Sequence, residues 1–229
     1  MIFGLLQIAL GLAILAIGYA IGTPGWILVW PAWSVILVGL GYLGLGARVF
    51  GKRREDGTLS PWIVLLLLPY FAVAWTLWQL KSRLSAEEAW HEVAPGLRLG
   101  RRPLRSGELP ADTRCVVDLT SELPRALPEL GLRYVCLPTL DTSVASDPEL
   151  AALLERIEGE PGPLYVHCAM GHGRSATVAA ALLIRRGLSA NVDEAIAHMK
   201  RIRPGVHLHA AQRAAVARIA ATDLDARAS

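Results

Sequence analysis

The nine-residue stretch HCAMGHGRS, residues 167–175, combines the side chains and glycines that a phosphate-handling site needs. Cys168 supplies a thiol, and Arg174 supplies a planar guanidinium that holds two oxygens at once. Gly171 and Gly173 allow the backbone to turn so that successive N–H groups point to one side and form a concave anion site. The stretch therefore has the composition of a cup for a tetrahedral dianion.

The surroundings of Cys168 favour the thiolate form of its side chain. A free thiol has a pKa of about 8.5, and helix N-termini and neighbouring cations lower such a pKa by several units. The thiolate is then a nucleophile aimed at a bound phosphorus. Ser175 is placed to hydrogen-bond the sulfur and to stabilise it as a leaving group. His167 is expected to orient the loop through its ring N–H, and Ala169, Met170 and His172 complete the loop.

A loop of this kind must leave a strand and enter a helix, and the flanking residues predict both elements. Residues 164–168, LYVHC, form a short apolar run typical of a buried strand. Residues 175–187, SATVAAALLIRRG, have the composition of a helix that ends at Gly187. Ligands bind at the carboxyl ends of the strands in parallel α/β sheets, which is where this loop would lie.

The rest of the second half of the chain alternates between short apolar runs and helical patterns. We expect strands over 97–100, 115–120 and 133–138, and helices over 148–160, 191–205 and 210–221. Asp147 is expected to cap the first of these helices before Pro148. Such alternation predicts an α/β domain with a central, mainly parallel sheet flanked by helices.

The pattern His-Cys, five residues, Arg-Ser resembles the signature of the cysteine-dependent protein-tyrosine-phosphatase superfamily. The segments VAPGLRLGRRP, VVDLTSE, LPTLD and VDEAIAHMKRIRP resemble the dual-specificity branch, over residues 93–220. The resemblance implies a dual-specificity-phosphatase-like domain in which Cys168 is the nucleophile and Arg174 binds phosphate. It also implies that Ser175 assists breakdown of a phosphocysteine.

The same resemblance implies a general acid: an aspartate on a loop that follows a strand upstream of the cysteine. The segment LPTLDTSVASDPEL offers Asp141, and Asp147 is its competitor. Asp118, at the end of a predicted strand, is expected to be structural. Gln212 falls where some relatives have a water-positioning glutamine, a position equally compatible with a helix surface. The spacing of the histidines around Cys168 fits no common zinc pattern, so we expect no metal and no cofactor.

The first 84 residues have a different character from the rest of the chain. Hydrophobic residues make up 53% of the sequence, and the first charged residue is Arg48. The apolar runs 3–21 and 26–47 are long enough to span a bilayer, for which about 20 residues are needed. A third run, 61–80, has Pro69 near its middle and either spans the membrane or is re-entrant.

The domain prediction is an all-α transmembrane region over 1–84 and a catalytic domain over 85–229. After residue 80 the chain has 19 basic and 18 acidic residues, a balance that argues against nucleic acid as a partner. Its three cysteines match no disulfide framework, which favours a reducing compartment and hence the cytoplasmic side of the membrane. Membrane lipid is the expected partner of the apolar region.

The loop residues between Cys168 and Arg174 include no lysine, unlike those of phosphatases similar to the phosphatase and tensin homologue. A singly phosphorylated substrate is therefore expected. Two classes stay open: a phosphorylated protein, or a phosphomonoester lipid such as phosphatidylglycerophosphate. A catalytically inactive phosphate-binding adaptor is the third alternative, and the presence of Cys168, Arg174 and Asp141 together argues against it.

Overall fold

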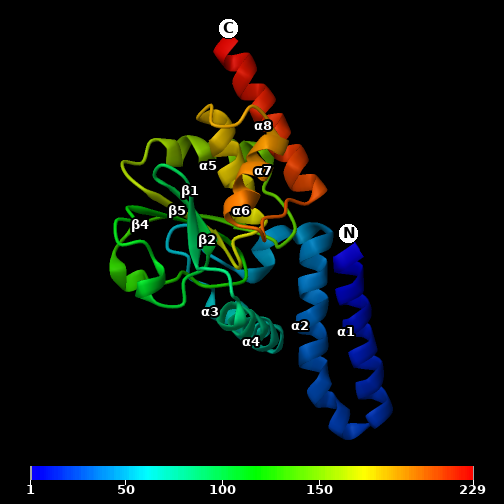
Figure 1. Ribbon diagram of the computed structural model, residues 1–229. Coiled ribbons are helices and arrows are strands. Elements are labelled where there is room, and N and C mark those ends of the chain that lie inside the picture. Colours follow the sequence, from blue (N-terminus) through cyan, green and yellow to red (C-terminus); the bar gives the residue numbers. More distant parts are fainter. Residues whose placement is uncertain (1, 229) are drawn as a thin grey trace. The chain divides into compact units, whose positions relative to one another are not determined.

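The computed structural model describes residues 2–228, and the chain divides into two compact units (Figure 1). The helical unit comprises Met1–Arg53, Gly57–Leu84 and Ser121–Pro124. The α/β unit comprises Arg54–Asp56, Ser85–Thr120 and Arg125–Ser229.

Helices dominate the described part of the first 84 residues, together with an isolated antiparallel bridge between Lys52 and Leu59. The helices are α1 (Ile2–Ile21), α2 (Val29–Leu40), α3 (Pro61–Leu66) and α4 (Leu68–Leu84), with 3₁₀ or π turns at Thr23–Leu28, Gly41–Leu45 and Gly46–Phe50. Two helical segments, Ile2–Ile21 and Thr23–Phe50, are long and apolar enough to cross a membrane. This result supports the first two of the predicted spans.

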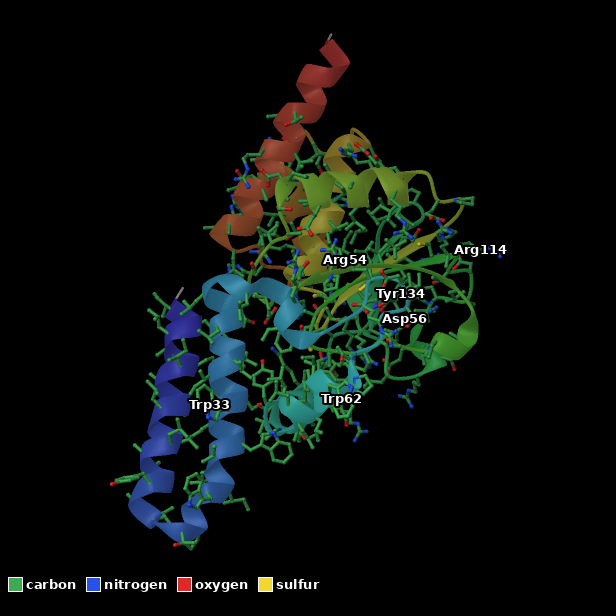
Figure 2. The ribbon with its side chains drawn as sticks, turned by 180° about the vertical axis from the view of Figure 1, so that it is seen from behind. Trp33, Arg54, Asp56, Trp62, Arg114 and Tyr134 are labelled. Atoms are coloured by element: carbon green, nitrogen blue, oxygen red, sulfur yellow. The ribbon has the colours of Figure 1, made fainter. Side chains whose placement is uncertain are left out.

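Apolar side chains cover the outside of the helical unit. Trp33 on α2 is 50% exposed and Trp62 on α3 is 79% exposed, and both are labelled in Figure 2. Among the exposed large apolar side chains described, all but Leu130 and Leu188 belong to residues 2–84. An apolar surface of this extent is unfavourable in water and is compatible with a lipid environment.

Small residues bring α1 and α2 into close contact as an antiparallel pair. They face each other at intervals of seven residues: Gly4 opposite Gly39, Gly11 opposite Ala32, and Gly18 opposite Gly25, which lies in the 3₁₀ turn before α2. A Cβ atom at residue 11 would overlap the side chain of Ile36. Small residues are typical of helix contacts inside membranes, where close van der Waals packing replaces the hydrophobic effect. The glycines are therefore required by the hairpin itself.

The third apolar run forms two helices because the helix is interrupted at Leu67, two residues before Pro69. Proline lacks an N–H and its ring obstructs the carbonyl of the preceding turn. Helix α2 supplies partners for the backbone at the break: Trp30 Nε1 donates to the carbonyl of Leu66 (3.0 Å), and Ser34 Oγ accepts from the N–H of Tyr70 (3.2 Å). Backbone groups at an irregularity must be satisfied in this way wherever water is absent.

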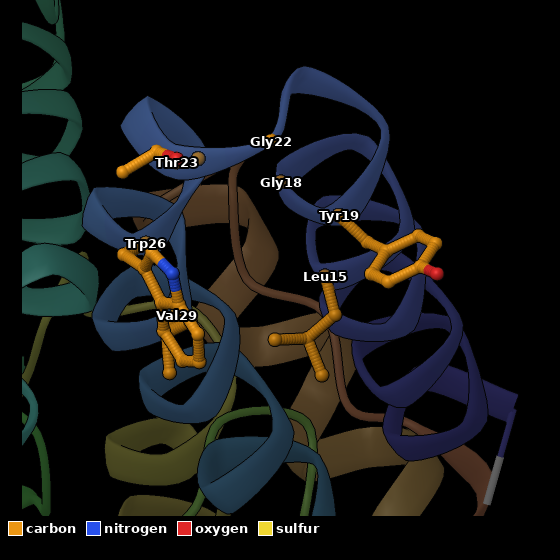
Figure 3. A pocket seen from close by; sticks show the side chains of 8 residues that line it. Leu15, Gly18, Tyr19, Gly22, Thr23, Trp26 and Val29 are labelled. Atoms are coloured by element: carbon orange, nitrogen blue, oxygen red, sulfur yellow. The ribbon is translucent and has the colours of Figure 1, made fainter.

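A pocket of about 450 Å³ lies where α1 turns into α2 (Figure 3). Leu15, Tyr19, Trp26 and Val29 contribute apolar side chains to its lining, together with glycines of the turn. All of its lining residues belong to the helical unit, so this pocket is distinct from the predicted phosphate site.

A five-stranded sheet is the centre of the α/β unit. Its strands are β1 (Trp90–Ala94), β2 (Leu97–Arg101), β3 (Cys115–Thr120), β4 (Arg133–Thr139) and β5 (Leu164–Cys168). Their order is β1-β2-β5-β3-β4, with β1 antiparallel to β2 and the other pairs parallel. The three central strands, β2, β5 and β3, are buried along their whole length. The predicted α/β class with a mainly parallel sheet is confirmed.

Four helices accompany the sheet: α5 (Asp147–Glu158), α6 (Arg174–Arg185), α7 (Val192–Ile202) and α8 (Ala210–Ala228). Helices α5, α6 and α7 contact both the strands and their neighbouring helices, and α8 packs against all three. The hydrophobic core lies between this helical layer and the sheet, and α6, whose described side chains are nearly all buried, lies at its centre.

The structure corrects three local expectations. The segment before residue 97 contains an edge strand, β1, which the sequence analysis did not predict. Ser146 rather than Asp147 is the N-cap of α5, since its N–H and hydroxyl both donate to Glu149. Asp147 is the first helical residue and binds Arg218 (2.8 Å). The last helix, α8, extends beyond the predicted residue 221 to Ala228.

Candidate active site

The loop 168–174 connects β5 to α6 at the carboxyl edge of the sheet, as predicted. Cys168 is the last residue of β5 and lies opposite Arg101 of β2. Gly171 has a φ of +79°, and a Cβ atom there would overlap the backbone of Gly100. Only glycine combines this left-handed conformation with so close an approach of two backbone segments.

The carbonyl groups of the loop are turned outward and hydrogen-bonded. The side chain of Arg203 donates to the carbonyls of Met170 (2.9 Å) and Gly171 (3.1 Å). Backbone N–H groups donate to two others, Arg102 N to Ala169 O (3.4 Å) and His207 N to His172 O (2.9 Å). The carbonyl of Gly173 accepts from Thr177 N (2.8 Å) and Thr177 Oγ1 (3.0 Å). In a trans peptide the carbonyl of one residue and the N–H of the following residue point in opposite directions. The amide groups of residues 170–174 are therefore directed to the inner side of the loop, where they form an anion-binding cup.

Cys168 lies at the base of this cup and is 4% exposed. Its sulfur accepts hydrogen bonds from Gly171 N (3.2 Å) and from Ser175 Oγ (3.3 Å). Burial by itself would raise the pKa of the thiol, but the charge of Arg174 and the hydrogen bonds from Ser175 outweigh it and lower the pKa. A thiolate is the nucleophilic form of cysteine, so the site activates this side chain.

Arg174 is the first residue of α6, and its guanidinium is buried beside the cup. Nη1 donates to the carbonyl of Thr139 at the end of β4 (2.9 Å), and Nη2 lies 3.3 Å from Oδ1 of Asp141. Asp141 follows β4, and its side chain is 67% exposed. Two segments far apart in sequence thus bring a cation and a carboxylate to the same edge of the sheet.

Asp118, which was expected to be structural, and Asp147, the competitor of Asp141, both have partners outside the loop. Asp118 is completely buried in β3 and accepts hydrogen bonds from Thr120 N and Oγ1 (2.8 and 2.7 Å) and from the Tyr134 hydroxyl (2.8 Å). Asp147 forms its ion pair with Arg218. These contacts place Asp118 in the role expected of it and leave Asp141 as the aspartate beside Arg174.

The two histidines of the loop have different surroundings. His167 is completely buried, and its Nδ1 lies 3.4 Å from the Cys168 carbonyl. His172 is partly exposed, and its Nε2 lies 2.6 Å from Oε2 of Glu87. Among the residues whose side chains the structure describes, no three His, Cys, Asp or Glu side chains are grouped so that they could hold a metal ion.

Sequence reasoning missed Arg203 and Glu87, and it left Gln212 undecided. Arg203 is 1% exposed although the sequence marks it only as part of the RIRPG segment that ends a helix. Gln212 is completely buried; its Nε2 donates to Ser143 O (2.9 Å), and its amide lies next to Gly173. The helix-surface alternative for Gln212 is therefore wrong, because α8 packs this side chain against the loop.

Comparisons with known proteins agree with the fold of the α/β unit. A family profile described as "Swiss Army Knife protein, DSP-PTPase phosphatase domain" (PTP-SAK) matches residues 105–224. A comparison with curated protein sequences gives no match.

Several solved structures are similar to the chain. A structure of PTPMT1 in complex with PI(5)P is 22% identical, with a TM-score of 0.52, covering 62% of this chain and 99% of that one. A mouse putative dual specificity phosphatase complexed with zinc tungstate is 25% identical, with a TM-score of 0.50 and coverages of 63% and 93%. Human DUSP28 is 24% identical, with a TM-score of 0.50 and coverages of 59% and 98%.

Proposed function

Because the chain belongs to the Swiss Army Knife family of DSP-PTPase phosphatase domains, we propose that it is a membrane-anchored phosphatase that hydrolyses phosphomonoesters through a phosphocysteine. The observation that carries this proposal is the environment of Cys168. At the base of a cup of inward-directed amides, the sulfur accepts hydrogen bonds from Gly171 N and Ser175 Oγ. The pKa of the Cys168 thiol is lowered by the charge of Arg174 and the hydrogen bonds from Ser175, which outweigh the effect of burial.

In the first step the Cys168 thiolate attacks the phosphorus of the bound ester. The S–P bond forms as the bond from phosphorus to the ester oxygen breaks, and Asp141 gives its proton to the departing oxygen. The loop amides and Arg174 bind the three remaining phosphate oxygens. They stabilise the charge that spreads over these oxygens in the transition state.

In the second step water attacks the phosphorus of the phosphocysteine. The new O–P bond forms as the P–S bond breaks, Asp141 takes the proton from water, and Cys168 leaves as a thiolate. Ser175 Oγ, 3.3 Å from the sulfur, stabilises this leaving group. Inorganic phosphate and the original enzyme are the products, and no metal or cofactor takes part in either step.

The helical unit is proposed to anchor the phosphatase in a membrane. Its two apolar segments and its exposed apolar side chains support this role. The three cysteines, free and buried in the structure, are compatible with a reducing compartment, so the α/β unit is proposed to lie on the cytoplasmic side.

A phosphorylated protein and a singly phosphorylated lipid are both candidate substrates. The loop offers no lysine for additional phosphates, which favours a single phosphate in either class. An anchored site is close to lipid headgroups, which favours the lipid. PTPMT1, one of the similar structures, was solved with a phosphoinositide, PI(5)P.

The test is phosphate release by the full-length protein in detergent with EDTA present. A phosphotyrosine peptide is compared with phosphatidylglycerophosphate, and Cys168→Ser is the control. Cys168-dependent release from the lipid, well above the peptide, would identify a lipid phosphatase. The opposite preference would identify an anchored protein phosphatase. Binding of tungstate with release from neither substrate would overturn the proposal and favour an inactive adaptor.

A further inference from the structure

Glu87, in the segment between α4 and β1, contacts the outer side of the phosphate loop. Its Oε2 lies 2.6 Å from His172 Nε2 and 2.8 Å from Arg203 Nη2, and its Oε1 accepts from Gly205 N (3.3 Å). One carboxylate therefore joins a residue of the loop, the buried arginine behind it and the backbone that follows α7. Glu87 precedes the region that matches the family profile.

Arg203 transmits this contact to the loop backbone. Its Nη2 donates to the carbonyl of Met170 (2.9 Å), which sets the plane of the peptide between Met170 and Gly171. The N–H of that same peptide donates to the sulfur of Cys168 (3.2 Å). The orientation of Arg203 thus controls one of the hydrogen bonds that stabilise the thiolate.

The next peptide of the loop is held in the same manner. Arg203 Nε donates to the carbonyl of Gly171 (3.1 Å), so the N–H of His172 is directed into the cup. Nη1 is secured by the carbonyl of Glu88 (3.0 Å) and by Nδ1 of His91 (3.1 Å). Besides the loop, the guanidinium therefore has three partners, Glu87, Glu88 and His91, which together hold it in one orientation.

The side chain of His172 provides the second link from Glu87 to the loop. A Cβ atom at Gly205 would overlap the His172 ring, so the ring lies directly against the backbone that follows α7. Burial by itself would raise the pKa of Glu87, but the hydrogen bond from His172 and the charge of Arg203 outweigh it and lower the pKa. Glu87 is therefore ionised at neutral pH, and its carboxylate binds the side chains of His172 and Arg203 at the same time.

We propose that Glu87 is a positioning residue for the phosphate loop, acting through Arg203 and His172 to keep the amides of Gly171 and His172 directed at the substrate phosphate and at Cys168. The inference rests on the proposed phosphatase function. Glu87 itself touches neither substrate nor sulfur. Its contribution is the geometry of the cup, and small displacements of such groups reduce rates strongly.

The test uses the full-length chain in detergent and the substitution Glu87→Gln, which keeps the shape of the side chain and removes its charge. Two measurements do not require turnover: the affinity for tungstate, and the pH dependence of Cys168 alkylation by iodoacetamide, with Cys168→Ser as the blank. Glu155→Gln, exposed on α5, is the matched control. Thermal stability is recorded for each variant.

We expect Glu87→Gln to weaken tungstate binding between about tenfold and a hundredfold. The alkylation profile should move to higher pH, because the Gly171 amide no longer points steadily at the sulfur. Glu155→Gln should behave as the unmodified chain does. A folded Glu87→Gln variant that has unchanged tungstate affinity and an unchanged alkylation profile, with only its stability reduced, would overturn the proposal.

Should Glu87→Gln fail to fold, His172→Gln provides the same test by removing one of the two links. Weaker tungstate binding and a displaced alkylation profile support the proposal, and values equal to those of the unmodified chain contradict it. Failure of the proposed function is distinguishable from failure of this inference. A chain that releases no phosphate from any substrate refutes the former, while the two binding measurements still decide the latter.

Discussion

The guanidinium of Arg174 lies 3.3 Å from the carboxylate of Asp141, at the carboxyl edge of the sheet. Both side chains are assigned to the same phosphoester, Arg174 to its non-bridging oxygens and Asp141 to the oxygen that departs. The side chain of Asp141 is largely exposed, while that of Arg174 is buried. When a phosphate binds the Arg174 guanidinium, the Asp141 side chain is therefore the one that must change position.

Asp141→Asn should separate these two roles. The amide cannot donate a proton as the acid does, so turnover should fall by a factor of about 10² to 10⁴ for alkyl phosphates. It should fall much less for aryl phosphates, whose leaving groups need little protonation. Tungstate affinity should be retained or increased, because the anion no longer competes with a carboxylate for Arg174. An equal loss of turnover on both ester classes would contradict the assignment of Asp141 as the acid.

Ser175→Ala should move the acid limb of the kcat/KM profile to higher pH. The thiolate is the reactive form, so kcat/KM rises as pH increases through the pKa of Cys168. The Ser175 hydrogen bonds help to lower that pKa, and losing the hydroxyl raises it. Hydrolysis of the phosphocysteine should also slow by about tenfold, giving a burst of the alcohol product.

The matched control for this prediction is Ser106→Ala, which removes an exposed hydroxyl from the same unit. Its pH profile should overlay that of the unmodified chain. A Ser175→Ala profile that kept the original acid limb and showed no burst would remove Ser175 from the mechanism.

Gly11→Leu should separate α1 from α2. A side chain at this position overlaps Ile36, and overpacking of a tight contact typically costs about 1–3 kcal/mol. Thermal unfolding in detergent, followed by circular dichroism, should show a lower midpoint than for the unmodified chain. Ala13→Leu adds the same bulk at an exposed position of α1 and should leave the midpoint unchanged. Similar losses in both variants would argue against the seven-residue contact pattern.

Ser34→Ala should destabilise the junction of α3 and α4. The variant removes the hydroxyl oxygen that accepts a hydrogen bond from the Tyr70 N–H, a loss of about 1–2 kcal/mol. Thr76→Ala is the control, because the Thr76 hydroxyl only adds a second bond to the Ala72 carbonyl within α4. Unfolding midpoints in detergent compare the two variants. A larger loss for Thr76→Ala would mean that Ser34 does not support the break.

The position of the loop 168–174 and most of the strands and helices could be predicted from the sequence because their signals are local. Cys168, Arg174 and Ser175 lie within eight residues, and the apolar periods on either side place them between a strand and a helix. The edge strand β1 was missed because its segment, WHEVA, lacks a clear apolar alternation. Ser146 and Asp147 are adjacent and both suit an N-cap, so only the side-chain geometry of α5 distinguished them.

The sequence by itself determined the chemistry of this protein: a thiol, a guanidinium and glycines on one short loop, and an apolar region long enough for a membrane. Only the tertiary structure decided which distant residues support that chemistry. Arg203 follows α7 and Glu87 precedes β1, and no local pattern connects them to Cys168. The physical reason is that peptide orientation depends on hydrogen bonds made across the fold, and these form only once the helices have packed on the sheet.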